Sequence, residues 1–264
     1  RDEEVFGHKP FAVIADAFAR AGIATLRYDD RGFGESTGDV VFCTTEDLKN
    51  DALSGIRLLR ERFDNVGVLG HSEGGTIALM LAGEKQVDFA ISLAGMIVSG
   101  AETLLAQNRQ ACQAVGLPES EVDAYCRLLS DTFDAIKTKS PLPSAGDYNL
   151  SADLKQNFQT ALGQFRTPYM EYFLGLDLST RLSDVTCPVM ALNGTKDSQV
   201  QCDRNLDVLR LGLPSGGKNL IKAEVGLNHI FQHCTTGAFS EYKEIEETIS
   251  PEVLSEMIAW IRAL

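Results

Sequence analysis

Apolar positions alternate between helical and strand spacing along the first hundred residues. Pro10 suits a first helical position, and apolar residues recur at helical spacing behind it, so residues 10–21 predict a helix. Further apolar segments, separated by turn residues, predict helices at 44–59 and 74–83 and strands at 23–30, 65–72 and 89–95. Such alternation is typical of a parallel sheet covered by helices on both faces.

The alternation stops in the middle of the chain and then resumes. Residues 99–178 predict helices and loops without a strand. After them the pattern predicts a strand at 187–194, a helix at 203–211, a loop at 213–219, a strand at 220–225 and a last helix capped by Ser250. We therefore expect an α/β core at 1–98 and 179–264, mostly a parallel sheet flanked by helices, interrupted by a helical insertion at 99–178.

Charge and composition exclude several classes of protein. The formal net charge of -13 disfavours binding to nucleic acid or to an anionic membrane. No apolar run reaches the roughly 18 residues that a membrane-spanning helix requires. The six cysteines form no CxxC pair, so most are expected to be free thiols, although Cys112 and Cys126 lie on adjacent predicted helices and could meet. The oligomeric state stays open.

The string GHSEGG places Gly70, Ser72 and Gly74 in a G-x-S-x-G pattern between a predicted strand and a predicted buried helix. A tight turn there strains the serine backbone and requires small neighbours, while Gly75 lets the helix pack closely on the sheet. The helix amino terminus favours developing negative charge, and the backbone N–H of Glu73 is a candidate oxyanion donor. The alternative interpretation is that Ser72 only caps the helix.

A serine nucleophile needs a base, usually a histidine held by a carboxylate. The order serine, acid, histidine selects Asp197 after the strand at 187–194 and His229 after the strand at 220–225. Asp203 and Asp207 compete less well, because they lie on the following predicted helix. The other three histidines are His8, His71 inside the turn, and His233.

His229 and His233 are four residues apart, a spacing that can bind a metal on one helix face. No HExxH motif is present and no acidic ligand is evident, so we expect no metal and a position for His233 outside the site. In the turn DDRGFGES, Gly32 and Gly34 are expected to adopt unusual backbone angles, with Asp29, Asp30 and Arg31 paired locally.

These motifs resemble the α/β-hydrolase superfamily, and more closely bacterial esterases that carry RYDDRGxGxSTGD, GHSEGG, CPVxALNGxKDxQV and GLNHxFQ, found here at 27–39, 70–75, 187–200 and 226–232. The resemblance implies hydrolysis of carboxylic esters through an acyl-enzyme, with Ser72 as nucleophile, Asp197 as acid and His229 as base. It also implies a small-molecule ester substrate, no cofactor, and a location in the bacterial cytoplasm or periplasm as a soluble protein.

The resemblance further implies that the insertion is a cap over the site. Its aromatic residues could shape an acyl pocket or could simply form the core of the insertion. Candidate substrate-binding residues are His71, Tyr169 and Phe173. Small or medium acyl esters are the expected substrates; a peptidase or amidase using the same residues, and a non-catalytic binding module or impaired fragment, are the alternatives.

In such proteins a second oxyanion N–H follows the strand that precedes the first helix. Nothing before Pro10 resembles that strand, whose slot would lie between residues 23–28 and 65–69. An empty slot would leave buried backbone groups unpaired, at about 1–3 kcal/mol each. We therefore expect N-terminal strands of the native protein to be missing from this chain.

Overall fold

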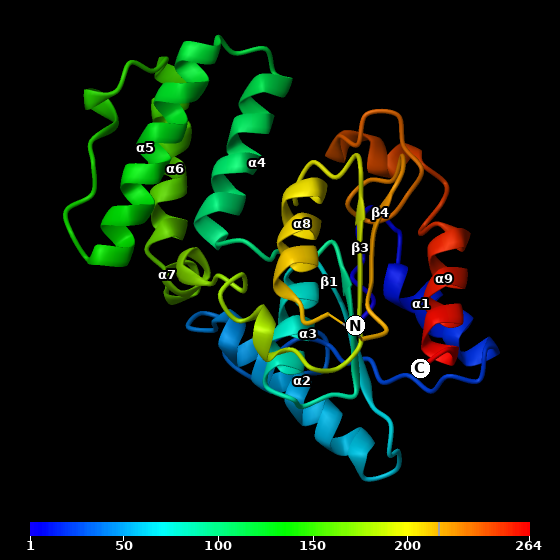
Figure 1. The fold of residues 1–264 in the computed structure, drawn as a ribbon. Coiled ribbons are helices and arrows are strands. Elements are labelled where there is room, and N and C mark those ends of the chain that lie inside the picture. The colour runs from blue at the N-terminus through cyan, green and yellow to red at the C-terminus, as the bar shows by residue number, and fades with distance from the viewer. Residues whose placement is uncertain (216) are drawn as a thin grey trace.

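The computed structural model describes residues 1–215 and 217–264 and contains one parallel sheet. Its strands follow the order β1 (Gly67–His71), β2 (Phe89–Leu93), β3 (Val189–Gly194) and β4 (Leu220–Glu224) (Figure 1). Helix α3 (Glu73–Gly83) joins β1 to β2, and α8 (Cys202–Gly212) joins β3 to β4, as parallel pairing requires. The predicted loop at 213–219 includes Gly216, which lies outside the described residues.

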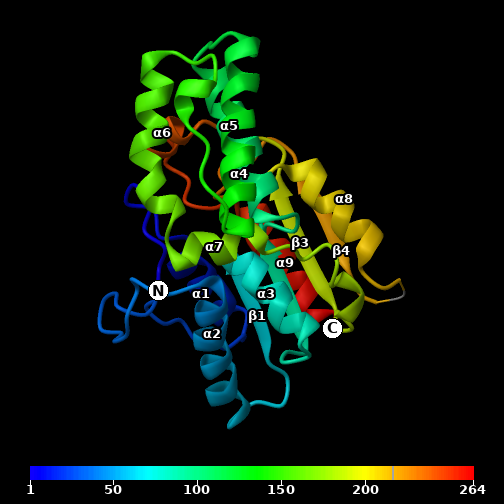
Figure 2. The same cartoon turned by 90° about the vertical axis from the view of Figure 1, so that its left-hand side faces the viewer.

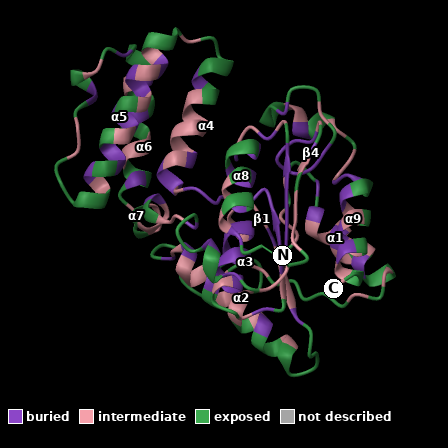
Figure 3. Ribbon diagram, in the orientation of Figure 1, coloured by how far each residue is buried: buried purple, intermediate pink, exposed green. Residues whose placement is uncertain are grey.

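Each face of the sheet has its own apolar core. Helices α2 (Thr45–Arg60), α3 and α8 cover one face, while α1 (Pro10–Arg20) and α9 (Pro251–Arg262) cover the other (Figure 1). Along the strands, Ala90, Val189 and Ala191 pack into the first core, and the alternate residues Ile91 and Met190 pack into the second. The predicted parallel sheet covered on both faces is therefore confirmed, and the central strand β3 is buried at every residue, whereas the edge strands β1 and β4 are mostly half-buried (Figure 3).

Local capping hydrogen bonds set the starts of helices α2 and α9. The Thr44 hydroxyl accepts a hydrogen bond from the Asp47 amide at 3.4 Å, and Asp47 accepts one from the Thr44 amide at 2.9 Å. This reciprocal pair is a capping box that begins α2. Ser250 caps α9 with Pro251 at the first helical position, as predicted.

Residues 99–178 form helices α4 (Gly100–Ala114), α5 (Glu119–Thr138), α6 (Ala152–Phe165) and α7 (Pro168–Gly175), and no strand. Figures 1 and 2 show these helices grouped to one side of the sheet. They have an apolar core of their own that includes Tyr125, Phe133 and Phe165, so these three aromatic residues serve the insertion itself. In the described part of the chain, no helix combines the length and apolarity needed to cross a membrane.

The strand predicted at 23–30 is wrong, because these residues belong to no strand in the structure. Residues 23–30 form no strand pairing with the sheet, and β1 is an edge strand of its four strands. Leu26 and Tyr28 instead lie against Gly55 of α2 and remain 40% and 41% exposed. A run with strand-like residues becomes a strand only when another strand satisfies its backbone groups, and that condition is not visible in the local pattern.

The turn after this segment is held by a longer-range contact than predicted. Gly32 and Gly34 do adopt positive φ angles, of 73° and 55°. Arg31, however, does not pair within the turn: its Nε and Nη2 donate to the two carboxylate oxygens of Asp51 on α2, at 2.7 and 2.8 Å. A bidentate guanidinium–carboxylate pair thus fastens the turn to the helix.

Candidate active site

Ser72 occupies a strained turn between β1 and α3. Its backbone angles, φ 53° and ψ -119°, are rare for a residue with a side chain, and such strain costs about 1–3 kcal/mol. Its amide donates to the Leu93 carbonyl at 2.8 Å, which ties the turn to β2. The Ser72 side chain makes no capping hydrogen bond to α3, so the interpretation of this serine as a mere helix cap is wrong.

The glycines around Ser72 differ in what they contribute. A Cβ on Gly70 would lie 2.0 Å from the Gly74 carbonyl oxygen, and one on Gly75 would lie 2.9 Å from the Gly95 Cα. Gly70 and Gly75 are therefore required by close backbone approach, as the motif predicts. A Cβ on Gly74 would meet nothing within 4 Å, so steric need within this chain does not explain that glycine.

This difference predicts opposite outcomes for two neighbouring substitutions. Gly70→Ala should lower the free energy of unfolding by about 3 kcal/mol, because a backbone carbonyl cannot rotate away as a side chain can. Gly74→Ala should change it by less than about 1 kcal/mol, since alanine suits a helix and has free space. Urea denaturation of both variants measures this, and equal destabilisation would contradict the turn geometry.

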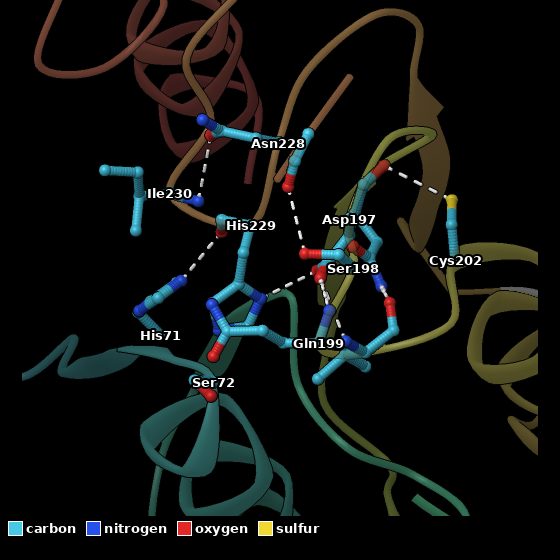
Figure 4. A network of polar contacts seen from close by, with 12 residues as sticks. His71, Ser72, Asp197, Ser198, Gln199, Cys202, Asn228, His229 and Ile230 are labelled. Atoms are coloured by element: carbon cyan, nitrogen blue, oxygen red, sulfur yellow. Dashed lines mark hydrogen bonds and ion pairs between the residues drawn. The ribbon is translucent and has the colours of Figure 1, made fainter. Parts of the chain in front are cut away.

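Asp197 and His229 meet beyond the ends of β3 and β4. His229 Nδ1 lies 2.7 Å from Asp197 Oδ2, and the two side chains are only 4% and 0% exposed. The other oxygen, Oδ1, accepts from the amides of Gln199 and Val200 at 2.7 and 2.9 Å, which fixes the carboxylate. A carboxylate only accepts, so Nδ1 carries the proton and Nε2 is left free. Figure 4 shows Ser72 directly below the His229 ring.

Two buried amide side chains shape the loop that carries His229. Asn228 Oδ1 accepts from the amides of Ile230 and Gln232 at 3.1 and 2.9 Å, and Asn228 Nδ2 donates to Gln232 Oε1 at 2.9 Å. Both amide residues are fully buried. Sequence reasoning missed them, although their signal was present: two amides that flank the histidine within GLNHIFQ.

His71 supports His229 from the other side. Its Nε2 donates to the His229 carbonyl oxygen at 2.8 Å, its Nδ1 lies 2.7 Å from Glu3 Oε1, and the two rings are 4.6 Å apart. Burial lowers the pKa of His71, but the hydrogen bond and charge of Glu3 outweigh it, so the pKa lies above its ordinary value. Both ring nitrogens are thus engaged inside the protein.

The remaining histidines lie elsewhere. His233 is 60% exposed, and its Nδ1 lies 3.0 Å from Glu247 Oε2. His229 and His233 therefore turn toward different carboxylates and do not converge on one metal position. His8 is buried and donates from Nε2 to the Tyr242 carbonyl oxygen at 3.1 Å. Within residues 1–215 and 217–264, no group of three or more His, Cys, Asp or Glu could hold a metal ion.

A family model described as "Serine aminopeptidase, S33" matches residues 9–211. The chain belongs to this family of α/β-hydrolases. The match includes Ser72 and Asp197 and ends before His229. The parallel sheet flanked by helices is the framework expected of this family of α/β-hydrolases.

A curated relative, esterase EstD of Thermotoga maritima, is 33% identical over 95 residues, which are 35% of this chain and 23% of that protein. The match thus spans about a quarter of EstD. Three solved structures share the fold over nearly the whole chain. The α/β hydrolase GrgF of Penicillium sp. sh18 has a TM-score of 0.57 and 16% identity, and the match covers 96% of this chain and 83% of GrgF. A bromoperoxidase of Bacillus anthracis has a TM-score of 0.55 and 14% identity, with 97% of this chain and 87% of that chain covered. Est1E of Butyrivibrio proteoclasticus, bound to ferulic acid, has a TM-score of 0.51 and 17% identity, with 99% of this chain and 85% of Est1E covered.

Each of the six cysteine thiols has a pKa above its ordinary value. All six cysteines are free. Burial raises the pKa of Cys43, which is close enough to Glu73 for the Glu73 charge to raise it further. Burial also raises the pKa of Cys202, to about 12, and the charge of Asp197 contributes to this rise. A thiol with a raised pKa is protonated at neutral pH and is a poor nucleophile.

A cavity of about 540 Å³ lies at the far end of α3 from Ser72. Leu79, Glu84, Tyr172 and Arg181 are among its lining residues, and Ser72, Asp197 and His229 are not. The size of a cavity therefore does not mark the candidate site, which is defined by the positions of Ser72, Asp197 and His229.

Proposed function

We propose that this protein hydrolyses carboxylic esters of small or medium acyl groups through an acyl-enzyme, using Ser72, Asp197 and His229. The observation that carries the proposal is the buried 2.7 Å contact between His229 Nδ1 and Asp197 Oδ2, beside a strained serine whose hydroxyl does not cap its helix. A histidine oriented by a carboxylate and placed over a serine is the arrangement that activates a hydroxyl.

In the proposed reaction, His229 Nε2 takes the proton of Ser72 as Oγ bonds to the ester carbonyl carbon. Asp197 stabilises the resulting imidazolium without accepting its proton. The tetrahedral intermediate collapses, the alcohol leaves with the proton from His229, and an acyl-serine remains. Water, activated by the same histidine, then releases the acid and restores Ser72. The residues of this chain supply every proton transfer.

The backbone N–H of Glu73 is the proposed oxyanion donor. It opens α3, where the first amides have no partner within the helix and the dipole favours negative charge. Such donors contribute because they are already oriented when the carbonyl oxygen becomes negative.

We also propose that residues 99–178 act as a cap on a core formed by 1–98 and 179–264. Helix α7 supports this, because the Tyr169 hydroxyl reaches the residue next to Ser72, donating to Glu73 Oε2 at 2.9 Å. Tyr169 stacks on Phe173 with ring centroids 5.7 Å apart, and this pair is proposed to contact the acyl group. For His71, the engaged ring nitrogens favour support of His229 over contact with substrate.

The family description favours one competing function, cleavage of peptide or amide bonds by the same three residues. The name of EstD favours esters. Comparing p-nitrophenyl esters of two to eight carbons with aminoacyl p-nitroanilides separates the two. Hydrolysis of the anilides alone would contradict the ester proposal.

A fluorophosphonate probe should label the native protein at Ser72, because only an activated serine attacks phosphorus rapidly. Mass spectrometry of the labelled peptide measures this, with Ser72→Ala as the control that should remain unlabelled. A folded native protein that takes up no probe would instead indicate a non-catalytic binding module.

A further inference from the structure

The side chain of Glu73 has contacts that the proposed reaction does not use. The reaction needs only its backbone N–H, yet its carboxylate accepts two hydrogen bonds from distant elements. Thr45 Oγ1, at the start of α2, donates to Oε1 at 2.6 Å, and the Tyr169 hydroxyl of α7 donates to Oε2 at 2.9 Å. Thr45 is fully buried. The residue after the nucleophile therefore joins the core to the insertion.

A second tyrosine of α7 repeats the contact. The Tyr172 hydroxyl donates to Glu46 Oε2 at 3.0 Å, and Glu46 also accepts from Lys49 at 2.6 Å. Tyr169 and Tyr172 are three residues apart, so both phenols project from one side of the helix. Helix α7 is thus fastened by two phenol–carboxylate hydrogen bonds, one at the nucleophile turn and one at α2.

We propose that Glu73 is a positioning residue whose carboxylate, held by Thr45 and Tyr169, locks α7 against the nucleophile turn and thereby restricts the size of acyl group that reaches Ser72. This inference rests on the proposed esterase function. It assigns to the Glu73 side chain a role separate from that of its backbone N–H.

The chemistry of the three groups fits a glutamate better than a glutamine. Both partners are hydroxyl donors, and a carboxylate offers an acceptor oxygen to each, whereas an amide offers one acceptor and one donor. Hydrogen bonds to a charged acceptor are also stronger than neutral ones. Burial raises the pKa of Tyr169, and Glu73 raises it further, so the phenol keeps the proton that it donates.

Tyr169→Phe removes the hydroxyl and keeps the stacked ring. We expect the ratio of kcat/KM for p-nitrophenyl octanoate to that for the acetate to rise about 3- to 10-fold, carried by a lower KM for octanoate, because the variant loses the charged hydrogen bond that joins α7 to Glu73. Tyr148→Phe is the matched control: it removes another tyrosine–carboxylate hydrogen bond, to Asp131, within the insertion and away from Glu73. An unchanged ratio in Tyr169→Phe would overturn the proposal.

Two replacements of Glu73 distinguish a role in positioning α7 from a role in the stability of the fold. Glu73→Ala should shift the ratio at least as far as Tyr169→Phe does, while Glu73→Gln, which keeps one of the two acceptor oxygens, should shift it less than Glu73→Ala. Equal ratios for Glu73→Ala and the native protein would overturn the role assigned to the side chain.

Amide hydrogen exchange tests the lock without any turnover. Residues 168–175 should exchange faster in Tyr169→Phe than in the native protein and in Tyr148→Phe. If the fluorophosphonate probe fails to label Ser72, the esterase proposal fails while the exchange result still decides whether the lock exists. Unchanged exchange in all three proteins would contradict it.

Discussion

His229→Ala should lower kcat/KM for p-nitrophenyl acetate by about 10⁴-fold or more, with the protein still folded. Alanine removes the group that takes the Ser72 proton in the proposed reaction, and it leaves the Asp197 carboxylate without its histidine partner. The 2.7 Å contact between Asp197 Oδ2 and His229 Nδ1 makes this the largest single effect that we expect. Steady-state kinetics measure it, with circular dichroism as the check on folding.

His233→Ala is the matched control, because it deletes the same side chain four residues later. His233 is 60% exposed and contacts Glu247 at 3.0 Å, so the variant should keep turnover within about twofold, as surface substitutions usually do. If His233→Ala were inactive and His229→Ala active, the proposed assignment of the base would be wrong.

Asp197→Asn should lower kcat by about 10⁴-fold with little loss of structure. The amide oxygen can still accept from Gln199 and Val200, which now donate to Oδ1 at 2.7 and 2.9 Å. The amide nitrogen then faces His229 Nδ1 as a donor. The imidazole must therefore carry its proton on Nε2, where it cannot receive the proton of Ser72.

Asp203→Asn provides the control for this change, since Asp203 lies in the first turn of α8 and is exposed. Its kcat should match that of the native protein. Single-turnover kinetics would locate the defect of Asp197→Asn in acylation, deacylation or both. Native-like kcat in Asp197→Asn would contradict the proposed role of Asp197.

The hydrolase family and the proposed ester chemistry rest on observations of different kinds. The family follows from a match over residues 9–211. The roles of Ser72, Asp197 and His229 remain proposals, which the buried Asp197–His229 contact and the strained Ser72 support. Probe labelling and the two substitutions above test these roles independently of the family.

The sequence alone predicted most elements of the core correctly, because their signals are local. Helical spacing, the cap at Ser250, and the strand–turn–helix around Ser72 all fall within a few residues of chain. The need for glycine at 70 and 75 was also visible, since a nucleophile turn brings nearby backbone together. Order along the chain was enough to propose Asp197 and His229 as partners of Ser72.

Tertiary structure alone decided which of the remaining residues have partners. The strand predicted at 23–30 failed because pairing depends on a neighbour that local pattern cannot supply. Arg31 forms hydrogen bonds with Asp51, 20 residues away in the sequence. His71 forms one with the carbonyl of His229, 158 residues away, and Tyr169 forms one with Glu73, 96 residues away. Hydrogen bonds act over about 3 Å whatever the separation in sequence, so only the folded chain determines which donors and acceptors meet.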